Sequence, residues 1–424
     1  MRGVAVFLMM EQHIGVWVWN SFASPSKFLE HPLFVGFNAL GGGAAPLFVS
    51  LAGAGSALFA ASRQSRWSAS RIDATMMRRG LGVMAFGVLL SLLTPSWFSG
   101  GDLRFPGLPD VFGSHGLVPV VLASVIVLGP LRRRLFAGHP QLGEHAPAWV
   151  MALVAAGVFA AYGLSGVGVA GVDPGSWFVL HLMGFAMLLG PLWRRLPTSA
   201  LLGLAVAVLF LAAGVQEWLD TPPHIGNNRM RDSSMPGGAF RLASAEGQFP
   251  ILPWLSLFLQ GVVVGRWTAA AQWRRIHLLA GGSLALGVIS AVLFWTVPAL
   301  RAGVAFHFLR FDGIFYPCSP AYILLVGGLV MSVTAGVMAW ERRRPLSADG
   351  VMVNLGRASL TLLLLHVWMF RELSRSVGLW SAFDAPAAFG VTMLAIGIYT
   401  LLAWQWRKVG FRFGAEWLLR KVAG

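Results

Sequence analysis

The sequence is poor in charge. Only 12% of its 424 residues are Asp, Glu, Lys or Arg, whereas a soluble protein carries about 25%. Apolar side chains make up 56% of the chain, with 18 Trp and 29 Phe, and lipid is the solvent that suits this composition. The single cysteine, Cys318, excludes an intramolecular disulfide and a cysteine-based metal cluster. The N-terminal apolar run lacks a small-residue cleavage site, so we interpret it as a first membrane span rather than a secretory signal.

Several catalytic signatures are also missing. No Gly-Lys-Ser/Thr sequence follows the glycines at 41–43, so they do not form a phosphate-binding loop. The GxSxG and HExxH motifs are absent, and no pair of histidines has convincing zinc spacing, so we expect no metal. Acidic residues within the apolar runs are few, essentially Glu11 and Glu217. This weighs against a proton-driven transporter, which needs carboxylate relays.

Long apolar runs dominate what is present. Twelve runs have the length needed to cross a bilayer, about 17–23 residues each. They lie at 2–20, 40–62, 80–98, 115–131, 148–168, 176–193, 199–217, 251–269, 277–297, 320–340, 355–373 and 385–405. Because 176–193 and 199–217 are joined by a very short connection, the sequence predicts an all-α polytopic membrane bundle of about 10–12 transmembrane helices.

The basic residues predict the orientation of this bundle. With the N-terminus in the cytoplasm, 23 of the 32 Lys and Arg residues lie in inner segments and 9 in outer ones. We therefore expect cytoplasmic N- and C-termini, and we interpret the net charge of +15 as a topology signal rather than a nucleic-acid footprint. Residues 1–405 are predicted to form one transmembrane domain, and 406–424 a short basic amphipathic segment on the inner surface.

The first apolar run contains ionisable residues that are costly in lipid. Arg2 and His13 lie eleven residues apart, which is within about 20° of three full helical turns, so they share one stripe about 16 Å long. One groove is thereby predicted to hold an anionic group near Arg2 and a reactive carbon near His13. Glu11 lies about 200° from His13 and faces elsewhere. The simpler alternatives are a positive-inside anchor for Arg2 and an interfacial histidine for His13.

Three other histidines are candidates for function. His366 lies near mid-membrane in the run 355–373, and His181 lies in the run 176–193; the alternative role for each is an interhelical hydrogen bond. His31 follows Glu30 in the first outer loop, where a solvated histidine is the alternative.

Six sequence blocks carry a family resemblance. They are RGVAVFLMMEQH at 2–13, APLFVSLAG at 45–53, MMRRGL at 76–81, FPILPWLSLFLQGVVVGR at 249–266, FYPCSPAYILL at 315–325 and LGRASLTLLLLHVWMF at 355–370. In this order they resemble the DUF1624 family, which is related to heparan-alpha-glucosaminide N-acetyltransferase and more distantly to the acyltransferase-3 membrane proteins.

The resemblance implies an acyltransferase of a bacterial cytoplasmic (inner) membrane. It would move an acetyl or other acyl group from cytoplasmic acyl-CoA to an extracytoplasmic glycan or lipid-linked acceptor. A base or a nucleophile is needed for this transfer, and neutral imidazole can serve as either; an acyl-histidine intermediate and direct transfer both remain open. Arginines suit the phosphates of the donor. The predicted catalytic residues are His13, His31, Glu11 and His366, and the predicted acyl-CoA-binding residues are Arg2, Arg78, Arg79 and Arg357.

Two other classes of function remain open. The first is a transporter or flippase for a lipid-linked or anionic solute, although no inverted repeat is evident. The second is a non-enzymatic scaffold, for which His13 and His366 would point into separate contacts. The expected partners are the bilayer, acyl-CoA and the acceptor, with no nucleic acid; the oligomeric state is left open.

Overall fold

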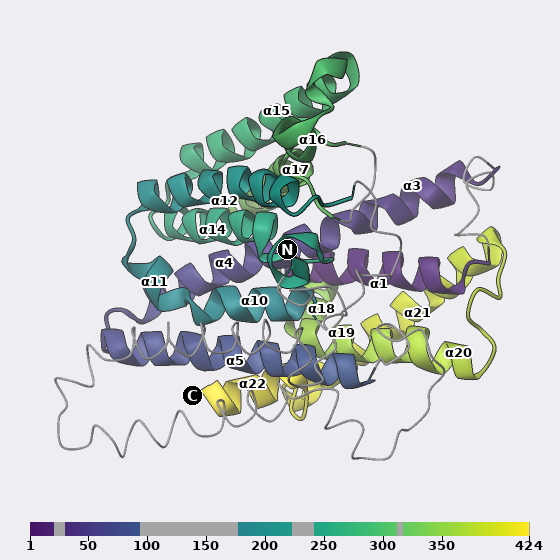
Figure 1. The fold of residues 1–424 in the computed structure, drawn as a ribbon. Coiled ribbons are helices and arrows are strands. Elements are labelled where there is room, and N and C mark those ends of the chain that lie inside the picture. The colour runs from purple at the N-terminus through teal and green to yellow at the C-terminus, as the bar shows by residue number, and fades with distance from the viewer. Residues whose placement is uncertain (21–29, 94–176, 223–240, 312–316, 424) are drawn as a thin grey trace, which may run out of the picture. The chain divides into compact units, whose positions relative to one another are not determined.

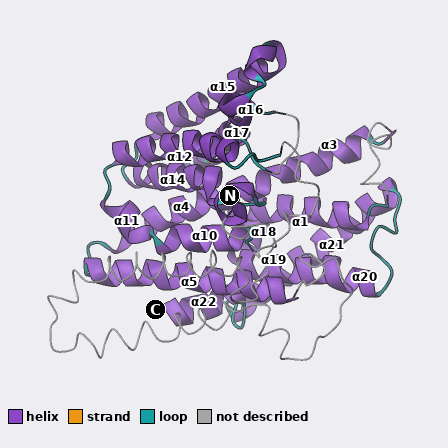
Figure 2. Ribbon diagram, viewed as in Figure 1, coloured by secondary structure: helices purple, strands orange, loops and turns teal. Residues whose placement is uncertain are grey.

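The computed structural model describes residues 1–20, 30–93, 177–222, 241–311 and 317–423 (Figure 1). Within these ranges the named regular elements are all helical (Figure 2). Five helices there are long and apolar enough to cross a membrane, or six if a bent pair counts as one span. The prediction of an all-α polytopic membrane protein is therefore confirmed. The predicted runs 115–131 and 148–168 lie outside the described residues.

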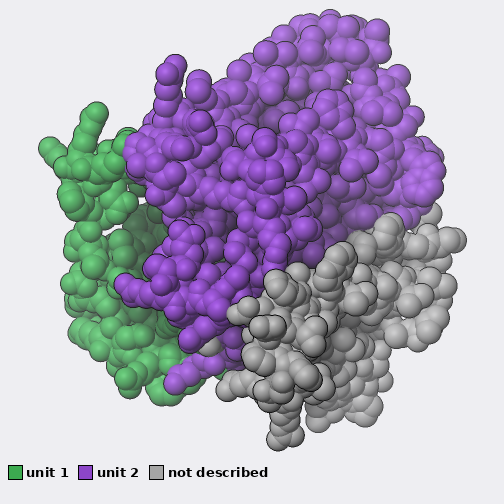
Figure 3. All heavy atoms as spheres, turned by 90° about the vertical axis from the view of Figure 1, so that its left-hand side faces the viewer, with its two compact units in different colours: residues 1–48, 90–105, 336–420 green, residues 49–89, 106–335, 421–424 purple. Residues whose placement is uncertain are grey.

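The chain divides into two compact units, which interleave along the sequence (Figure 3). Unit 1 comprises residues 1–48, 90–105 and 336–420. Unit 2 comprises residues 49–89, 106–335 and 421–424.

Unit 1 is built around the N-terminal helix, α1 (Arg2–Val18), which contacts helices from both ends of the unit. The other elements of this unit are α3 (Pro32–Leu40), η1 (Gly41–Gly43), α18 (Val351–Arg357), α19 (Ser359–Val367), η5 (Trp368–Leu373), α20 (Ser374–Ser376), α21 (Ala385–Trp406), η6 (Arg407–Val409) and the start of α22 (Ala415–Ala423). Glycine permits two of the contacts of α1. A Cβ at Gly3 would lie 1.9 Å from the carbonyl oxygen of Met352, and one at Gly41 would lie 2.2 Å from Cβ of Gln12. Small residues at such crossings let helix backbones approach closely in a membrane protein.

The predicted span 355–373 is broken. Helices α18 and α19 meet at a bend of 76° next to Ala358. The bend exposes the first backbone N–H groups of α19, which a helix cannot satisfy internally. The carboxylate of Glu416, at the start of α22, accepts hydrogen bonds from the backbone N–H groups of Leu360 and Thr361. The C-terminal segment thereby caps the helix that carries His366.

Unit 2 contains the remaining long helices. They are most of α4 (Ala44–Arg63), most of α5 (Ala69–Leu93), α10 (Val179–Leu188), α11 (Gly190–Arg195), α12 (Thr198–Trp218), η3 (Leu242–Glu246), α14 (Ile251–Ala269), α15 (Trp273–Thr296), η4 (Pro298–Leu300), α16 (Gly303–Leu309) and most of α17 (Pro320–Arg343). The backbones of α4 and α14 approach each other closely at Gly53. A Cβ at this position would lie only 2.1 Å from the carbonyl oxygen of Phe258 on α14. A Cβ at Gly261 would lie equally close to the carbonyl oxygen of Ser50.

Helix bounds follow the apolar runs closely in most places. Helices α12, α14 and α21 cover the runs 199–217, 251–269 and 385–405. Helix α5 differs, because it begins at Ala69 although its apolar run begins at 80. Asp73 lies in this extra length and is buried against two arginines, so part of the polar stretch between the predicted runs 40–62 and 80–98 is helical. The C-terminal helix is also shorter than the predicted segment 406–424, because Gly410 adopts a left-handed turn before α22 begins at Ala415.

Candidate active site

Two histidines from opposite ends of the chain meet within unit 1. Nδ1 of His13 on α1 lies 2.9 Å from Nε2 of His366 on α19. The planes of the two rings are nearly parallel, with centroids 5.2 Å apart and an interplanar angle of 12°. His366 is fully buried, whereas His13 retains partial exposure. The pair thus has one fully buried member and one with a partly exposed surface.

The hydrogen bonds determine which nitrogens carry protons. Nδ1 of His366 lies 2.8 Å from the carbonyl oxygen of Leu362, and a carbonyl can only accept, so this nitrogen carries the hydrogen. In a neutral ring Nε2 of His366 is then an acceptor, and Nδ1 of His13 must donate to it. With both rings neutral, Nε2 of His13 carries the lone pair. This is the atom that can act as a base or a nucleophile.

Two tryptophan rings extend this aromatic cluster, and the first of them, Trp17, lies close to both histidines, with its ring centroid 6.1 Å from that of His366. The ring of Trp17, one turn after His13 on α1, stacks on His13 with a centroid distance of 4.9 Å. Trp17 also stacks on Trp380, at 6.3 Å. The Trp17 indole, which Trp380 supports from its own contact, restricts how the His13 ring can rotate.

A buried guanidinium lies beside this stack. Arg371 is 4% exposed, and its guanidinium carbon lies 5.8 Å from the centroid of Trp17 and 5.2 Å from that of Trp380. Arg375 covers Trp380 at 4.0 Å. Arg371 belongs to the π-helical turn η5, and turns of this kind occur frequently at functional sites. The turn directs both Arg371 and Glu372 into the protein.

Glu11 lies elsewhere, as its angular position on the helix predicts. It is fully buried, and its Oε1 accepts a hydrogen bond of 3.3 Å from Asn38. It therefore contacts the α3–η1 region, while His13 contacts α19. Glu11 is too far around α1 to share the histidine pair's face.

The other predicted residues are distributed over several places. His31 precedes α3, and its ring meets the edge of Trp19 rather than joining the histidine pair. Arg2 and Arg357 are both exposed. Arg2 lies at the α1–α18 contact, because a Cβ at Gly356 would lie 3.0 Å from Cβ of Arg2, and Arg357 is the next residue of α18. Arg78 and Arg79 belong to unit 2, where Arg79 lies over the ring of Phe59.

The stripe of α1 between Arg2 and His13 is packed. Val6 and Met9 lie on it and are buried, at 0% and 4% exposure. The groove predicted along this stripe is therefore filled by apolar side chains, so a donor molecule has to approach His13 along another path.

His181 has a structural position in unit 2. Its Nδ1 accepts a hydrogen bond from the backbone N–H of Phe178 at the start of α10. A Cβ at Gly87 would lie 2.9 Å from this ring, so a glycine on α5 makes room for it. These contacts favour the helix-packing interpretation of His181.

Sequence reasoning missed Trp17, Trp380 and Arg371. Trp17 could have been found, because it lies four residues after His13 on the same helical face. Arg371 also carried a signal, as an ionisable residue at the end of an apolar run. Trp380 carried none, because only tertiary structure brings it to the stack.

One comparison with known proteins adds to this geometry. The family model described as heparan-alpha-glucosaminide N-acetyltransferase, catalytic, matches residues 1–293. The match includes His13 and ends before α19 and its His366. The chain matches no curated protein and no solved structure significantly.

Proposed function

Because this chain belongs to the heparan-alpha-glucosaminide N-acetyltransferase catalytic family, we propose that it transfers an acetyl group at the His13–His366 pair. The family and the apolar helices identify an integral-membrane acetyltransferase. The observation that carries the catalytic assignment is the 2.9 Å contact between Nδ1 of His13 and Nε2 of His366. A scaffold protein would leave these two histidines in separate contacts, and that expectation is not met.

The pair supplies a base with a defined orientation. Nε2 of His13 takes the proton from a hydroxyl or amine of the acceptor, and Nδ1 of the same ring stays bonded to His366. His366 is held in turn by the carbonyl of Leu362. A base oriented by a second group, which is oriented by a third, is the general arrangement for activating a nucleophile.

The reaction balances without a further reactant. The acceptor oxygen or nitrogen attacks the thioester carbonyl of acetyl-CoA, the carbon–sulfur bond breaks, and the thiolate leaves with the proton that His13 had taken. In the second possible route, Nε2 of His13 attacks the carbonyl first and carries the acetyl group to the acceptor. The partial exposure of His13 is compatible with both routes.

Arg371 is suited to the charge that develops during transfer. A thioester carbonyl under attack acquires negative charge on oxygen, and a buried guanidinium aimed at that charge stabilises it. The burial of Arg371 and its contact with Trp17, the ring that stacks on His13, support this role.

We further propose that the donor is cytoplasmic acyl-CoA and the acceptor an extracytoplasmic glycan or lipid-linked molecule, in a bacterial inner membrane. The positive-inside distribution of arginine supports the orientation. Arg2 and Arg357, which are exposed on unit 1, are proposed to contact the phosphates of the donor through charge-assisted hydrogen bonds. Arg78 and Arg79 are proposed separately for the same role on unit 2.

The test is consumption of acetyl-CoA by the purified protein without any ion gradient, which also separates an enzyme from a transporter. Released CoA thiol can be measured directly, because Cys318, the single cysteine, is buried. We expect His13→Ala to lower kcat by about 100-fold or more, the usual range for loss of a general base. His366→Ala should lower it less, because it removes an orienting group.

The matched control is His277→Ala, since His277 is exposed on α15. Retention of full activity by the His13→Ala protein would refute the catalytic assignment. Absence of acetyl-CoA consumption together with gradient-driven solute uptake would favour the transporter.

A further inference from the structure

A cavity of about 210 Å³ lies in unit 2, apart from the histidine pair. It is lined by the end of α4, the start of α5, α11 and the end of α14. Its polar lining consists of Ser56, Gln64, Arg194 and Arg266, and its apolar lining includes Ala60 and Met76. The positive-inside distribution predicts that these helix ends face the cytoplasm.

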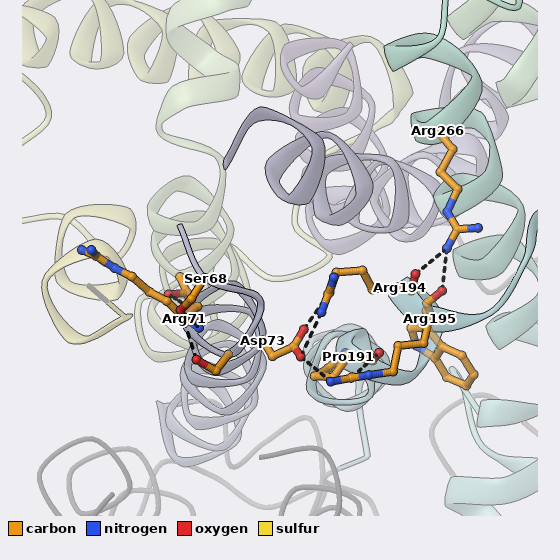
Figure 4. A network of polar contacts seen from close by, with 10 residues as sticks. Ser68, Arg71, Asp73, Pro191, Arg194, Arg195 and Arg266 are labelled. Carbon is orange, nitrogen blue, oxygen red and sulfur yellow. Dashed lines mark hydrogen bonds and ion pairs between the residues drawn. The ribbon is translucent and has the colours of Figure 1, made fainter. Parts of the chain in front are cut away.

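Arg194 is held in place by a buried carboxylate (Figure 4). Nε of Arg194 donates to Oδ1 of Asp73 at 2.8 Å, and Nη2 donates to Oδ2 at 3.2 Å. Arg195 donates to the same Oδ2 at 2.7 Å. One carboxylate therefore balances only one of two guanidinium charges. This bidentate contact also fixes the direction in which Arg194 presents its other donors.

Arg266 is held by backbone carbonyl groups rather than by a carboxylate. Its Nη1 donates to the carbonyl of Leu196. Its Nη2 donates to the carbonyls of Trp193 and Arg194 (Figure 4). These carbonyls lie at the C-terminal end of α11, where a helix leaves its last carbonyls without internal partners. The acceptors are neutral, so the full charge of Arg266 remains at the cavity.

Donors remain available to a ligand. A guanidinium has five N–H groups, and those of Nη1 of Arg194 have no acceptor among the described residues. Nε of Arg266 likewise has none within that part of the chain. The cavity thus combines an excess of positive charge, spare donors in fixed directions and an apolar wall.

We propose that this cavity binds a phosphate group, from either an anionic lipid headgroup or free phosphate. Guanidinium groups with several fixed donors match the geometry of phosphate oxygens. Basic pockets between transmembrane helices on the cytoplasmic side bind anionic headgroups in other membrane proteins. The volume is several times the roughly 30 Å³ that a water molecule takes in the liquid, so a tetrahedral phosphate fits. This inference goes beyond the proposed acetyl transfer and does not depend on it.

The test measures binding to the purified protein in detergent by isothermal titration calorimetry. The probes are dioctanoyl phosphatidate, inorganic phosphate and, as an uncharged control, dioctanoylglycerol. Arg194→Gln should raise the Kd of the bound phosphate probe by about tenfold, the effect of losing one charge-assisted contact. Ala60→Leu should abolish binding by filling the cavity without changing any charge.

Arg195→Gln is the matched control, because Arg195 shares Asp73 with Arg194 but does not line the cavity. It removes the same charge and should change the Kd by less than about twofold. Phosphatidate binding alone identifies a lipid headgroup, and binding of inorganic phosphate identifies a soluble source. Absence of binding of both phosphate probes would overturn the proposal, as would equal weakening by Arg194→Gln and Arg195→Gln, or binding that persists in Ala60→Leu.

Discussion

Glu416 accepts two hydrogen bonds from Thr361, a residue far from it in the sequence but in the same unit. The carboxylate accepts a hydrogen bond of 3.2 Å from the backbone N–H of Thr361 and one of 2.6 Å from its hydroxyl. The residue before Glu416, Ala415, returns a hydrogen bond of 2.8 Å from its own backbone N–H to the same hydroxyl. A negative charge at the positive end of a helix is favourable, so this contact holds the first turn of α19.

Glu416→Ala should therefore lower both stability and activity. Losing a helix cap costs about 1–2 kcal/mol, and the loosened helix carries His366 five residues further on. We expect a lower Tm in detergent and a lower kcat for acetyl-CoA consumption. Glu416→Gln keeps an acceptor oxygen and should recover much of both. Arg420→Ala, an exposed change on the same helix, serves as the control. A Tm for Glu416→Ala equal to that of the control would argue against the capping role.

Asp73→Asn should be among the more destabilising single changes in unit 2. It leaves Arg194 and Arg195 without a counter-charge, and breaking a buried pair costs about 3–5 kcal/mol. Both arginine side chains retain some exposure, at 28% and 41%, so we expect about 2–4 kcal/mol. The measurement is the free energy of unfolding in detergent.

Asp349→Asn is the comparison for that variant. It also breaks a close ion pair, with Arg407 at 2.6 Å, but the Asp349 side chain is 70% exposed. The expected loss is below about 1 kcal/mol. Equal losses in the two variants would show that burial of Asp73 contributes nothing.

Much of the fold could be predicted from apolar run length, because a bilayer admits only segments that satisfy their own backbone hydrogen bonds. Helices α12, α14 and α21 illustrate this. The break at Ala358 could not be predicted in the same way. Its exposed N–H groups are satisfied by Glu416, a partner distant in the chain. The early start of α5 escaped prediction for a similar reason, since Asp73 is tolerated only because α11 supplies its partners.

The candidate site was predictable one residue at a time, but not as an assembly. His13 and His366 each stood out as ionisable groups in apolar runs. Their contact spans 353 residues of sequence, and no periodicity within either helix indicates it. The groove along α1 was a wrong prediction, because helical periodicity shows which residues share a face but not what packs against that face. Val6 and Met9 fill it.

Acid should destabilise the protein in part through His307. Burial, assisted by the charge of Arg310, lowers the pKa of His307 below its usual value, while Glu217 and Asp220 act in the opposite direction. As the pH falls, His307 of the unfolded chain therefore takes up its proton at a higher pH than His307 of the folded protein. Stability falls as the pH drops below about 6.5 toward the folded-state pKa and levels off beneath it, with a slope of at most about 1.4 kcal/mol per pH unit.

This dependence can be measured as the Tm between about pH 7.5 and 5. His307→Gln should flatten part of the decline relative to the unmodified protein. His277→Gln, at an exposed position on α15, should leave the decline unchanged. The effect of His307 would be disproved by parallel curves for the unmodified protein and His307→Gln.

Trp17→Leu should slow acetyl transfer without unfolding the protein. The indole stacks on His13 at 4.9 Å with an interplanar angle of 20°, and such pairs contribute about 0.5–1.5 kcal/mol beyond burial. If that energy orients His13 in the transition state, kcat should fall by about two- to tenfold with little change in KM. Trp17→Phe keeps a ring face and should retain more activity than Trp17→Leu. Trp295→Leu, an exposed tryptophan on α15, controls for the general loss of an indole. A rise in KM at constant kcat would instead indicate that Trp17 binds substrate rather than orienting the histidine.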